Sequence, residues 1–202
     1  MQTAYIGMGS NLASPAGPPD ATLAAAVARL ASFGQVAARS SLYSTKPVGF
    51  TDQPRFTNAV VALETELAPQ TLLAALLDLE RAFGRNRSEG FQNGPRTLDL
   101  DILLMGDIQS TEPGLQIPHP RLADRAFVLI PLNEIAPRAV HPVHRKTVAQ
   151  LLDSLRKSRE SETNEVVPIE SAPWSLGAGS AAAEPASPLR AKASEPHRHG
   201  DR

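Results

Sequence analysis

The apolar residues of positions 1–105 change their spacing in a fixed order, and that order limits the folds open to the chain. Four segments have the short apolar or alternating pattern typical of β-strands: Thr3–Met8, Val36–Tyr43, Thr57–Leu67 and Leu98–Met105. Two segments between them repeat apolar residues every three or four positions, as one face of an α-helix does: Leu23, Val27, Leu30 and Ala31 in the first, and Leu72, Leu76, Leu79 and Phe83 in the second. Pro69 suits the first turn of the second helix, and Gly84 suits its end.

The resulting order is β-α-β-β-α-β. It predicts an α+β fold with a ferredoxin-like core, in which an antiparallel sheet carries helices on one face. Residues 117–157 would add a C-terminal edge hairpin and one or two helices. Hydrophobic residues make up 42% of the 202 positions, which is enough to bury a core.

The composition changes near Ser158, where the apolar periodicity stops. Small residues, prolines and charges dominate from there to the last residue, and such a segment buries too little apolar surface to offset the entropy of ordering. We therefore predict one domain over residues 1–158 and a disordered, low-complexity tail over residues 159–202. Trp174, the single tryptophan, lies in that tail and is expected to be solvated or loosely packed.

Overall charge and cysteine content exclude several classes of protein. Twenty lysines and arginines against 21 aspartates and glutamates give a net charge of −1, which argues against a nucleic-acid or anionic-membrane binder that relies on bulk charge. The absence of cysteine excludes disulfides, cysteine zinc sites and thiol nucleophiles. No apolar run approaches the roughly 18 residues of a membrane span, and the first residues lack the pattern of a signal peptide. We expect a soluble, monomeric, cytoplasmic protein.

The last predicted strand carries two aspartates, Asp99 and Asp101. Side chains alternate along a strand, so both carboxylates project from one face, about 7 Å apart, while Leu98, Leu100 and Ile102 project from the other. A solvated strand face is the simpler explanation, but aspartate is disfavoured in strands and two of them need a reason. Paired carboxylates with no cysteine nearby favour Mg²⁺, which binds one or two carboxylates together with phosphate oxygens.

Basic residues precede and follow this strand. Arg85, Arg87 and Arg96 cluster within a glycine-containing segment, and Arg125 comes later. Guanidinium groups bind phosphate in bidentate fashion, so arginines beside a metal-binding carboxylate pair indicate a polyphosphate site rather than an inconsequential surface loop. His119 lies between two prolines that fix its backbone, which makes it a candidate phosphate donor.

Six motifs then follow one another in a recognisable order: Tyr5–Leu12, Ser44–Gly49, Gln53–Ala59, Gly84–Arg87, Gly94–Ile102 and Ile117–Val128. Together they resemble the 6-hydroxymethyl-7,8-dihydropterin pyrophosphokinases of the folate pathway, over roughly residues 1–155. The resemblance implies transfer of the β,γ-pyrophosphoryl group of ATP to the hydroxymethyl group of the pterin, with release of AMP. It also implies two Mg²⁺ ions held by Asp99 and Asp101, with a further role for Asp101 in orienting or deprotonating the attacking hydroxyl.

The resemblance assigns the remaining site residues by motif. The expected catalytic residues are Asp99, Asp101, Arg85 and Arg96. The expected ATP-binding residues are Glu80, Arg87, Arg96, Ile102, His119 and Arg125. The expected pterin-binding residues are Thr45, Val48, Phe56, Asn58 and Phe127. The spacing of Glu80 alone would predict a solvated helix residue.

This chain departs from the family pattern at a few positions. Gln92 and Asn93 stand where an Arg-Trp pair is found, Lys46 where a proline is common, and Phe56 and Pro120 where tyrosines are. Two alternatives remain at this point: a ferredoxin-like binding module without catalysis, and another metal-dependent phosphate-transfer enzyme such as a nucleotidyltransferase. Intact Asp99 and Asp101 argue against the first, and the pterin-pocket residues argue against the second.

Overall fold

A computed structural model describes residues 1–86 and 93–176 of the chain. Its centre is a six-stranded sheet with the order β10-β3-β4-β1-β5, in which β2 also pairs with β4. Every neighbouring pair of strands is antiparallel. The bounds of these strands are β1 (Gln2–Ser10), β2 (Gln35–Arg39), β3 (Leu42–Thr45), β4 (Phe56–Thr65), β5 (Asp99–Met105) and β10 (Val167–Ile169). The order confirms the predicted ferredoxin-like core.

The predicted strand over residues 36–43 is two strands, β2 and β3, which both pair with β4. Ser40 lies at the break, where its amide donates to Val60 O at 2.9 Å and its hydroxyl accepts from Val60 N at 3.0 Å. Because the serine side chain replaces one backbone partner of the ladder, the strand is interrupted without leaving the Val60 amide unsatisfied. Alternation of apolar residues does not reveal such a substitution.

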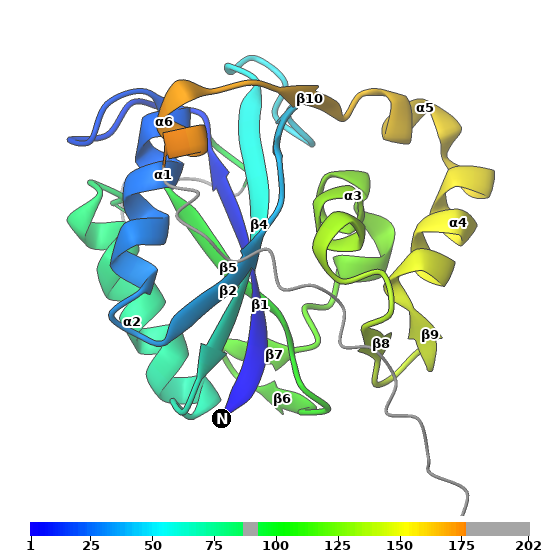
Figure 1. Cartoon of the computed structure of the whole chain (residues 1–202). Helices are drawn as coiled ribbons and strands as arrows, with labels where there is room; N and C mark the ends of the chain where they lie inside the picture. Colours follow the sequence, from blue (N-terminus) through cyan, green and yellow to red (C-terminus); the bar gives the residue numbers. More distant parts are fainter. Residues whose placement is uncertain (87–92, 177–202) are drawn as a thin grey trace, which may run out of the picture.

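The helices cover the two faces of the sheet in pairs (Figure 1). On one face, α1 (Pro19–Leu30) and α2 (Pro69–Ala82) bury the predicted leucine stripes against β-strand residues that include Ile6 and Leu100. Pro69 begins α2 as predicted, and Gly84 follows its end with a φ of +84°, which favours glycine. On the other face, α3 (Ala126–Ile135) and α4 (Val148–Ser158) are the predicted C-terminal helices.

Short elements connect these layers. Two hairpins each form a separate two-stranded sheet: β6 (Ser110–Glu112) with β7 (Leu115–Ile117), and β8 (Val140–His141) with β9 (Lys146–Thr147). A short helix, η1 (Leu122–Asp124), precedes α3. The strand added to the edge of the core sheet is therefore β10, which comes from the segment predicted to be disordered.

The prediction of disorder is wrong for residues 160–176. These residues form α5 (Glu160–Asn164), β10 and α6 (Ala172–Leu176), and α6 lies against α1 (Figure 1). Trp174 is only 7% exposed, and its Nε1 donates to Ser40 O at 3.0 Å. The edge of β3 supplies backbone hydrogen-bond partners for β10, and the core supplies a buried site for the Trp174 indole. Neither feature can be recognised from the amino-acid composition of the segment. Residues 177–202 lie outside the described part of the chain.

Strand β5 places the aspartates as predicted. Leu98, Leu100 and Ile102 join the core beneath α1 and α2, whereas Asp99 and Asp101 line a cavity on the opposite face. Leu103 follows on the same face as the two aspartates, and a register shift against β1 brings Leu104 into the same core, beneath α3 and α4. Among the described helices, none is long and apolar enough to cross a membrane.

Candidate active site

The two aspartates of β5 share one cavity but differ in their surroundings. The Asp101 side chain is 43% exposed and that of Asp99 is 18% exposed, so Asp101 is the more accessible carboxylate. Partial desolvation, with repulsion from Asp99 and Glu80, raises the pKa of Asp101 to about 6. The surroundings of Asp101 therefore disfavour its negative charge.

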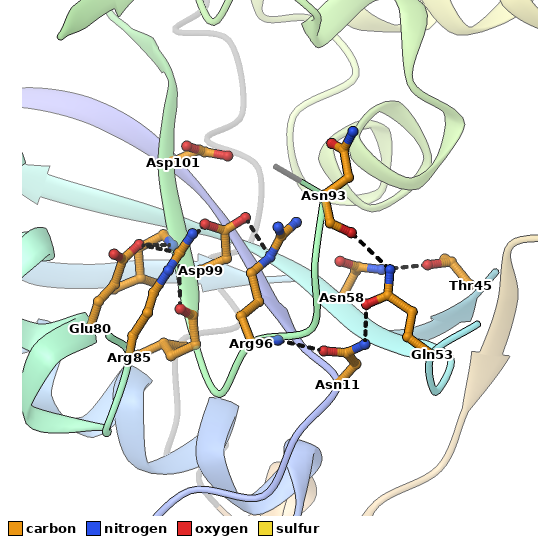
Figure 2. A network of polar contacts seen from close by, with 12 residues as sticks. Asn11, Thr45, Gln53, Asn58, Glu80, Arg85, Asn93, Arg96, Asp99 and Asp101 are labelled. Atoms are coloured by element: carbon orange, nitrogen blue, oxygen red, sulfur yellow. Dashed lines mark hydrogen bonds and ion pairs between the residues drawn. The ribbon is translucent and has the colours of Figure 1, made fainter. Parts of the chain in front are cut away.

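Two arginines already neutralise Asp99. Arg85 forms an ion pair with Asp99 Oδ1, and Arg96 Nε lies 3.1 Å from Asp99 Oδ2 (Figure 2). Arg85 also donates to Leu98 O at 3.0 Å, which fixes the guanidinium against the start of β5. Although desolvation opposes it, attraction to Asp99 and Glu80 raises the pKa of Arg85, so this guanidinium stays charged. The sequence-predicted cluster of arginines and aspartates is thus brought together.

Glu80 is a buried part of the same network. Its side chain is 1% exposed, and its Oε1 accepts from Arg85 Nη1 at 2.9 Å and from Leu100 N at 2.8 Å (Figure 2). Strand β5 forms the edge of the sheet, so the Leu100 amide needs an acceptor from outside the ladder. The interpretation of Glu80 as a solvated helix residue is therefore wrong, because its helix faces that edge.

Asn11 and Gln53 connect two loops beside the aspartates, and sequence reasoning did not select either residue. Asn11 Oδ1 accepts from Arg96 N at 2.8 Å, and Asn11 Nδ2 donates to Gln53 Oε1 at 3.0 Å (Figure 2). Gln53 Nε2 in turn donates to Asn93 O at 2.8 Å. Both side chains belong to motifs named above, Tyr5–Leu12 and Gln53–Ala59, which is the signal that could have identified them.

The five predicted pterin-binding residues line one small cavity next to the aspartates: Thr45, Val48, Phe56, Asn58 and Phe127. Asn58 Nδ2 donates to Thr45 Oγ1 at 2.7 Å, and both side chains are buried. Val48 is 63% exposed and lies at the rim.

An arginine guanidinium lies over each of the two aromatic rings of this cavity. The Arg96 guanidinium lies 4.9 Å from the centre of the Phe56 ring, and the Arg125 guanidinium lies 5.3 Å from that of Phe127. The same arginines also line the cavity that holds Asp99 and Asp101. The two cavities are therefore continuous in their lining.

Gly9 makes room for the Asn58 amide. Gly9 lies opposite both Asn58 and Asp99 in the neighbouring strands. A Cβ atom at this position would lie 2.9 Å from Asn58 Oδ1, closer than real contacts allow. This close approach therefore requires glycine at position 9.

A third cavity, of about 370 Å³, lies on the other side of Asp101. It is lined by Asp101, Ile102, Leu115, Gln116, His119 and Pro120, among others. His119 Nδ1 accepts from Arg121 N at 3.1 Å, so the ring proton is on Nε2, which lies 3.9 Å from Asp101 Oδ2. Desolvation and the positive charges of Arg125 and Arg121 lower the pKa of His119 to about 4, which keeps the ring neutral at neutral pH. The remaining predicted ATP-binding residue, Arg87, lies outside the described residues.

Paired carboxylates, neighbouring guanidinium groups and an aromatic cavity on a ferredoxin-like sheet are features typical of a phosphate-transfer enzyme that also binds a flat heterocycle. Comparison with known proteins gives the family. Residues 5–137 match the family described as 7,8-dihydro-6-hydroxymethylpterin-pyrophosphokinase, and the chain belongs to this family. The membership removes the alternative of a nucleotidyltransferase.

Relatives from several bacteria support the assignment. Over 160 residues the chain is 44% identical to the 2-amino-4-hydroxy-6-hydroxymethyldihydropteridine pyrophosphokinase of Methylorubrum extorquens, which covers 78% of this chain and 96% of that protein. The enzyme of the same name from Pseudomonas aeruginosa is 48% identical over 137 residues, covering 68% and 82% of the two chains. The wild-type Plasmodium falciparum HPPK-DHPS structure shares the fold with a TM-score of 0.60 at 15% identity, covering 81% of this chain and 46% of that one.

Proposed function

We propose that this protein transfers pyrophosphate from ATP to 6-hydroxymethyl-7,8-dihydropterin and releases AMP, as a step in tetrahydrofolate synthesis. The observation that carries the proposal is the arrangement of three adjoining cavities. The central cavity shares Arg96, Arg125 and Phe127 with the aromatic cavity, and it shares Asp101 and His119 with the third. A heterocycle on one side and a triphosphate on the other would therefore meet at the carboxylates of β5.

The aromatic cavity suits the pterin. Phe56 and Phe127 offer ring faces for stacking, which favours a flat substrate. The buried pair of Thr45 and Asn58 offers polar atoms to read the edge of the heterocycle. Phe56 retains the ring of the tyrosine common in the family and loses one hydroxyl, so stacking is preserved at this position.

The third cavity suits ATP. Leu115 and Ile102 give it apolar walls beside His119, whose neutral ring directs its Nε2 proton toward the central cavity. Arg85, Arg96 and Arg125 would contact the phosphates, with Arg87 as a further predicted contact. Glu80 positions Arg85 and β5 through its buried carboxylate, so we assign it a positioning role behind the nucleotide.

The carboxylates fit Mg²⁺. In the described part of the chain there is no cluster of three or more possible metal ligands, and Mg²⁺ characteristically takes only one or two carboxylates when phosphates complete its shell. Asp99 is neutralised by arginines, whereas the side chain within ion-pair range of Asp101, among the described residues, is the neutral His119. Two ions held by Asp99 and Asp101 would neutralise triphosphate charge and favour in-line displacement. Asp101 would in addition accept a hydrogen bond from the attacking hydroxyl.

The experiment is AMP formation from ATP and the pterin with Mg²⁺, comparing the wild-type chain with Asp101→Asn. We expect pterin-dependent AMP from the wild type and at least about a hundredfold loss in the variant, because a general-base or metal-binding carboxylate is typically worth that much. Asp107→Asn, an exposed aspartate in the turn after β5, is the matched control and should keep wild-type activity. Equal activity in Asp101→Asn, or AMP release that does not need the pterin, would contradict the proposal. The monomeric state and the cytoplasmic location stay predictions.

A further inference from the structure

We propose that Glu165 is a positioning residue for the pterin site, and that the C-terminal segment over residues 160–176 is therefore part of the substrate-binding apparatus. The inference rests on the proposed function of the aromatic cavity. It starts from the loop over residues 46–55, which leaves β3 directly after Thr45 and enters β4 directly before Phe56. Both of these flanking residues line the cavity, so the position of the loop's two ends decides its shape.

The two ends of this loop carry like charges. Thr45 and Phe56 form the last register pair between β3 and β4, and Lys46 and Arg55 follow that pair on the two sides of the loop. Positive charges that face each other across neighbouring strands repel and destabilise the pairing. Without a counter-charge, this repulsion would act directly beside Thr45 and Phe56.

Glu165 supplies the counter-charge to both ends. Its Oε1 lies 2.7 Å from Lys46 Nζ, and its Oε2 lies 3.9 Å from Arg55 Nη1. Arg55 Nη2 also donates to the Glu165 carbonyl at 3.2 Å, and Arg55 Nε donates to Ser44 Oγ at 2.8 Å. One carboxylate therefore bridges both cations and links them to β3.

The C-terminal segment holds this carboxylate in place. Strand β10 begins two residues after Glu165, where Val167 pairs with Ser44 of β3. Farther on, Ser171 Oγ donates to Asp20 Oδ2 at 2.8 Å and Trp174 is buried, which anchors the segment on α1 and the core. Ser171 and Trp174 fix the segment on the core, and Glu165 contacts the loop. The segment therefore holds the two ends of the loop in a defined position beside the pterin site.

A cavity beside the loop increases the importance of these contacts. A cavity of about 430 Å³ lies between loop residues Pro47 and Val48 on one side and Glu162 and Val166 on the other. The loop is therefore not supported by close apolar packing over that stretch, and the ion pairs at Glu165 connect it to the segment across the gap.

The expected effect is moderate because the pairs are exposed. The side chains of Lys46, Arg55 and Glu165 are 62%, 42% and 45% exposed, and exposed ion pairs contribute little individually. We expect Glu165→Gln to raise the KM for the pterin about fivefold, while kcat and the KM for ATP stay within about twofold of wild type. Glu165→Asp, which keeps the charge, should recover part of the loss.

The test compares steady-state kinetics of the full chain in these variants at low and high ionic strength. Glu160→Gln, a charge-neutralising change at the start of helix α5, which ends directly before Glu165, is the matched control and should leave all constants unchanged. Screening weakens exposed ion pairs, so the difference between wild type and Glu165→Gln should shrink at high salt. The inference would be overturned if Glu165→Gln left the KM for the pterin unchanged. It would also be overturned if the KM for ATP rose, or kcat fell, by the same factor, or if the effect did not depend on salt. Failure of the wild type to form AMP would instead overturn the proposed function, so the two are distinguishable.

Discussion

Replacement of Glu80 by alanine should destabilise the protein strongly, although a glutamate on a helix is usually exposed to solvent. The substitution removes the acceptor for two donors, Leu100 N at 2.8 Å and Arg85 Nη1 at 2.9 Å. A hydrogen bond to a charged group contributes about 1.5–3 kcal/mol, so two such bonds set a range of about 3–6 kcal/mol. Arg85 keeps its contacts with Asp99 and Leu98 O, and we therefore expect a loss near the lower limit, about 3 kcal/mol in the free energy of unfolding.

A second substitution, Glu80→Gln, separates the effect of losing the charge from the effect of losing side-chain volume. Glu80→Gln keeps an acceptor for the Leu100 amide and fills the same space, so its cost should be smaller, about 1–2 kcal/mol. Asp78→Asn is the control on the same helix, because its ion pair with Arg81 is 69% exposed on both sides and should contribute only about 0–1 kcal/mol.

The assay is urea unfolding followed by circular dichroism, with linear extrapolation to zero denaturant and comparison of the slopes. A double variant with Arg85→Ala should lose less than the sum of the two single variants, because each removes a partner of the same network. The reasoning is refuted if Glu80→Ala costs no more than Asp78→Asn, since the buried carboxylate would then not stabilise the edge of β5.

Three further predictions concern other parts of the molecule. Gly9→Ala should weaken pterin binding about three- to tenfold in calorimetry and leave ATP binding unchanged, because the new Cβ would lie 2.9 Å from Asn58 Oδ1 and displace it. Equal pterin affinities of the wild type and the variant would contradict the packing argument. Burial of Tyr43 and the hydrogen bond from its hydroxyl to Glu134 raise the pKa of Tyr43 from 10 to about 12, so the protein should lose stability as the pH rises through that interval. The loss should be smaller in Tyr43→Phe, and identical alkaline unfolding profiles of the two proteins would exclude this contribution. Trp174→Ala should cost about 3–5 kcal/mol and abolish hydrogen-exchange protection in β10, whereas retained protection would show that the indole does not anchor the C-terminal segment.

Much of the core followed from local pattern alone. The helical stripes and the alternation of β5 are properties of neighbouring residues, so the order of elements and the common face of Asp99 and Asp101 could be predicted. The motif resemblance went further and named residues scattered along the chain, and the structure gathers Thr45, Asn58 and Phe127 in one cavity. Their roles stay predictions until the variants are measured.

Other features depend on contacts between residues far apart in the chain, and no local pattern contains them. The burial of Glu80 depends on the edge of β5 lying against the end of α2, where the Leu100 amide needs an acceptor. The bridging position of Glu165 depends on β10 pairing with β3, more than 120 residues earlier in the chain. The sequence by itself determined the order of strands and helices over residues 1–105 and which face of β5 is acidic, because these are short-range properties of the backbone. Only the tertiary structure decided which polar groups are buried and whether residues 160–176 are ordered, because burial and strand pairing depend on partners that folding alone brings into contact.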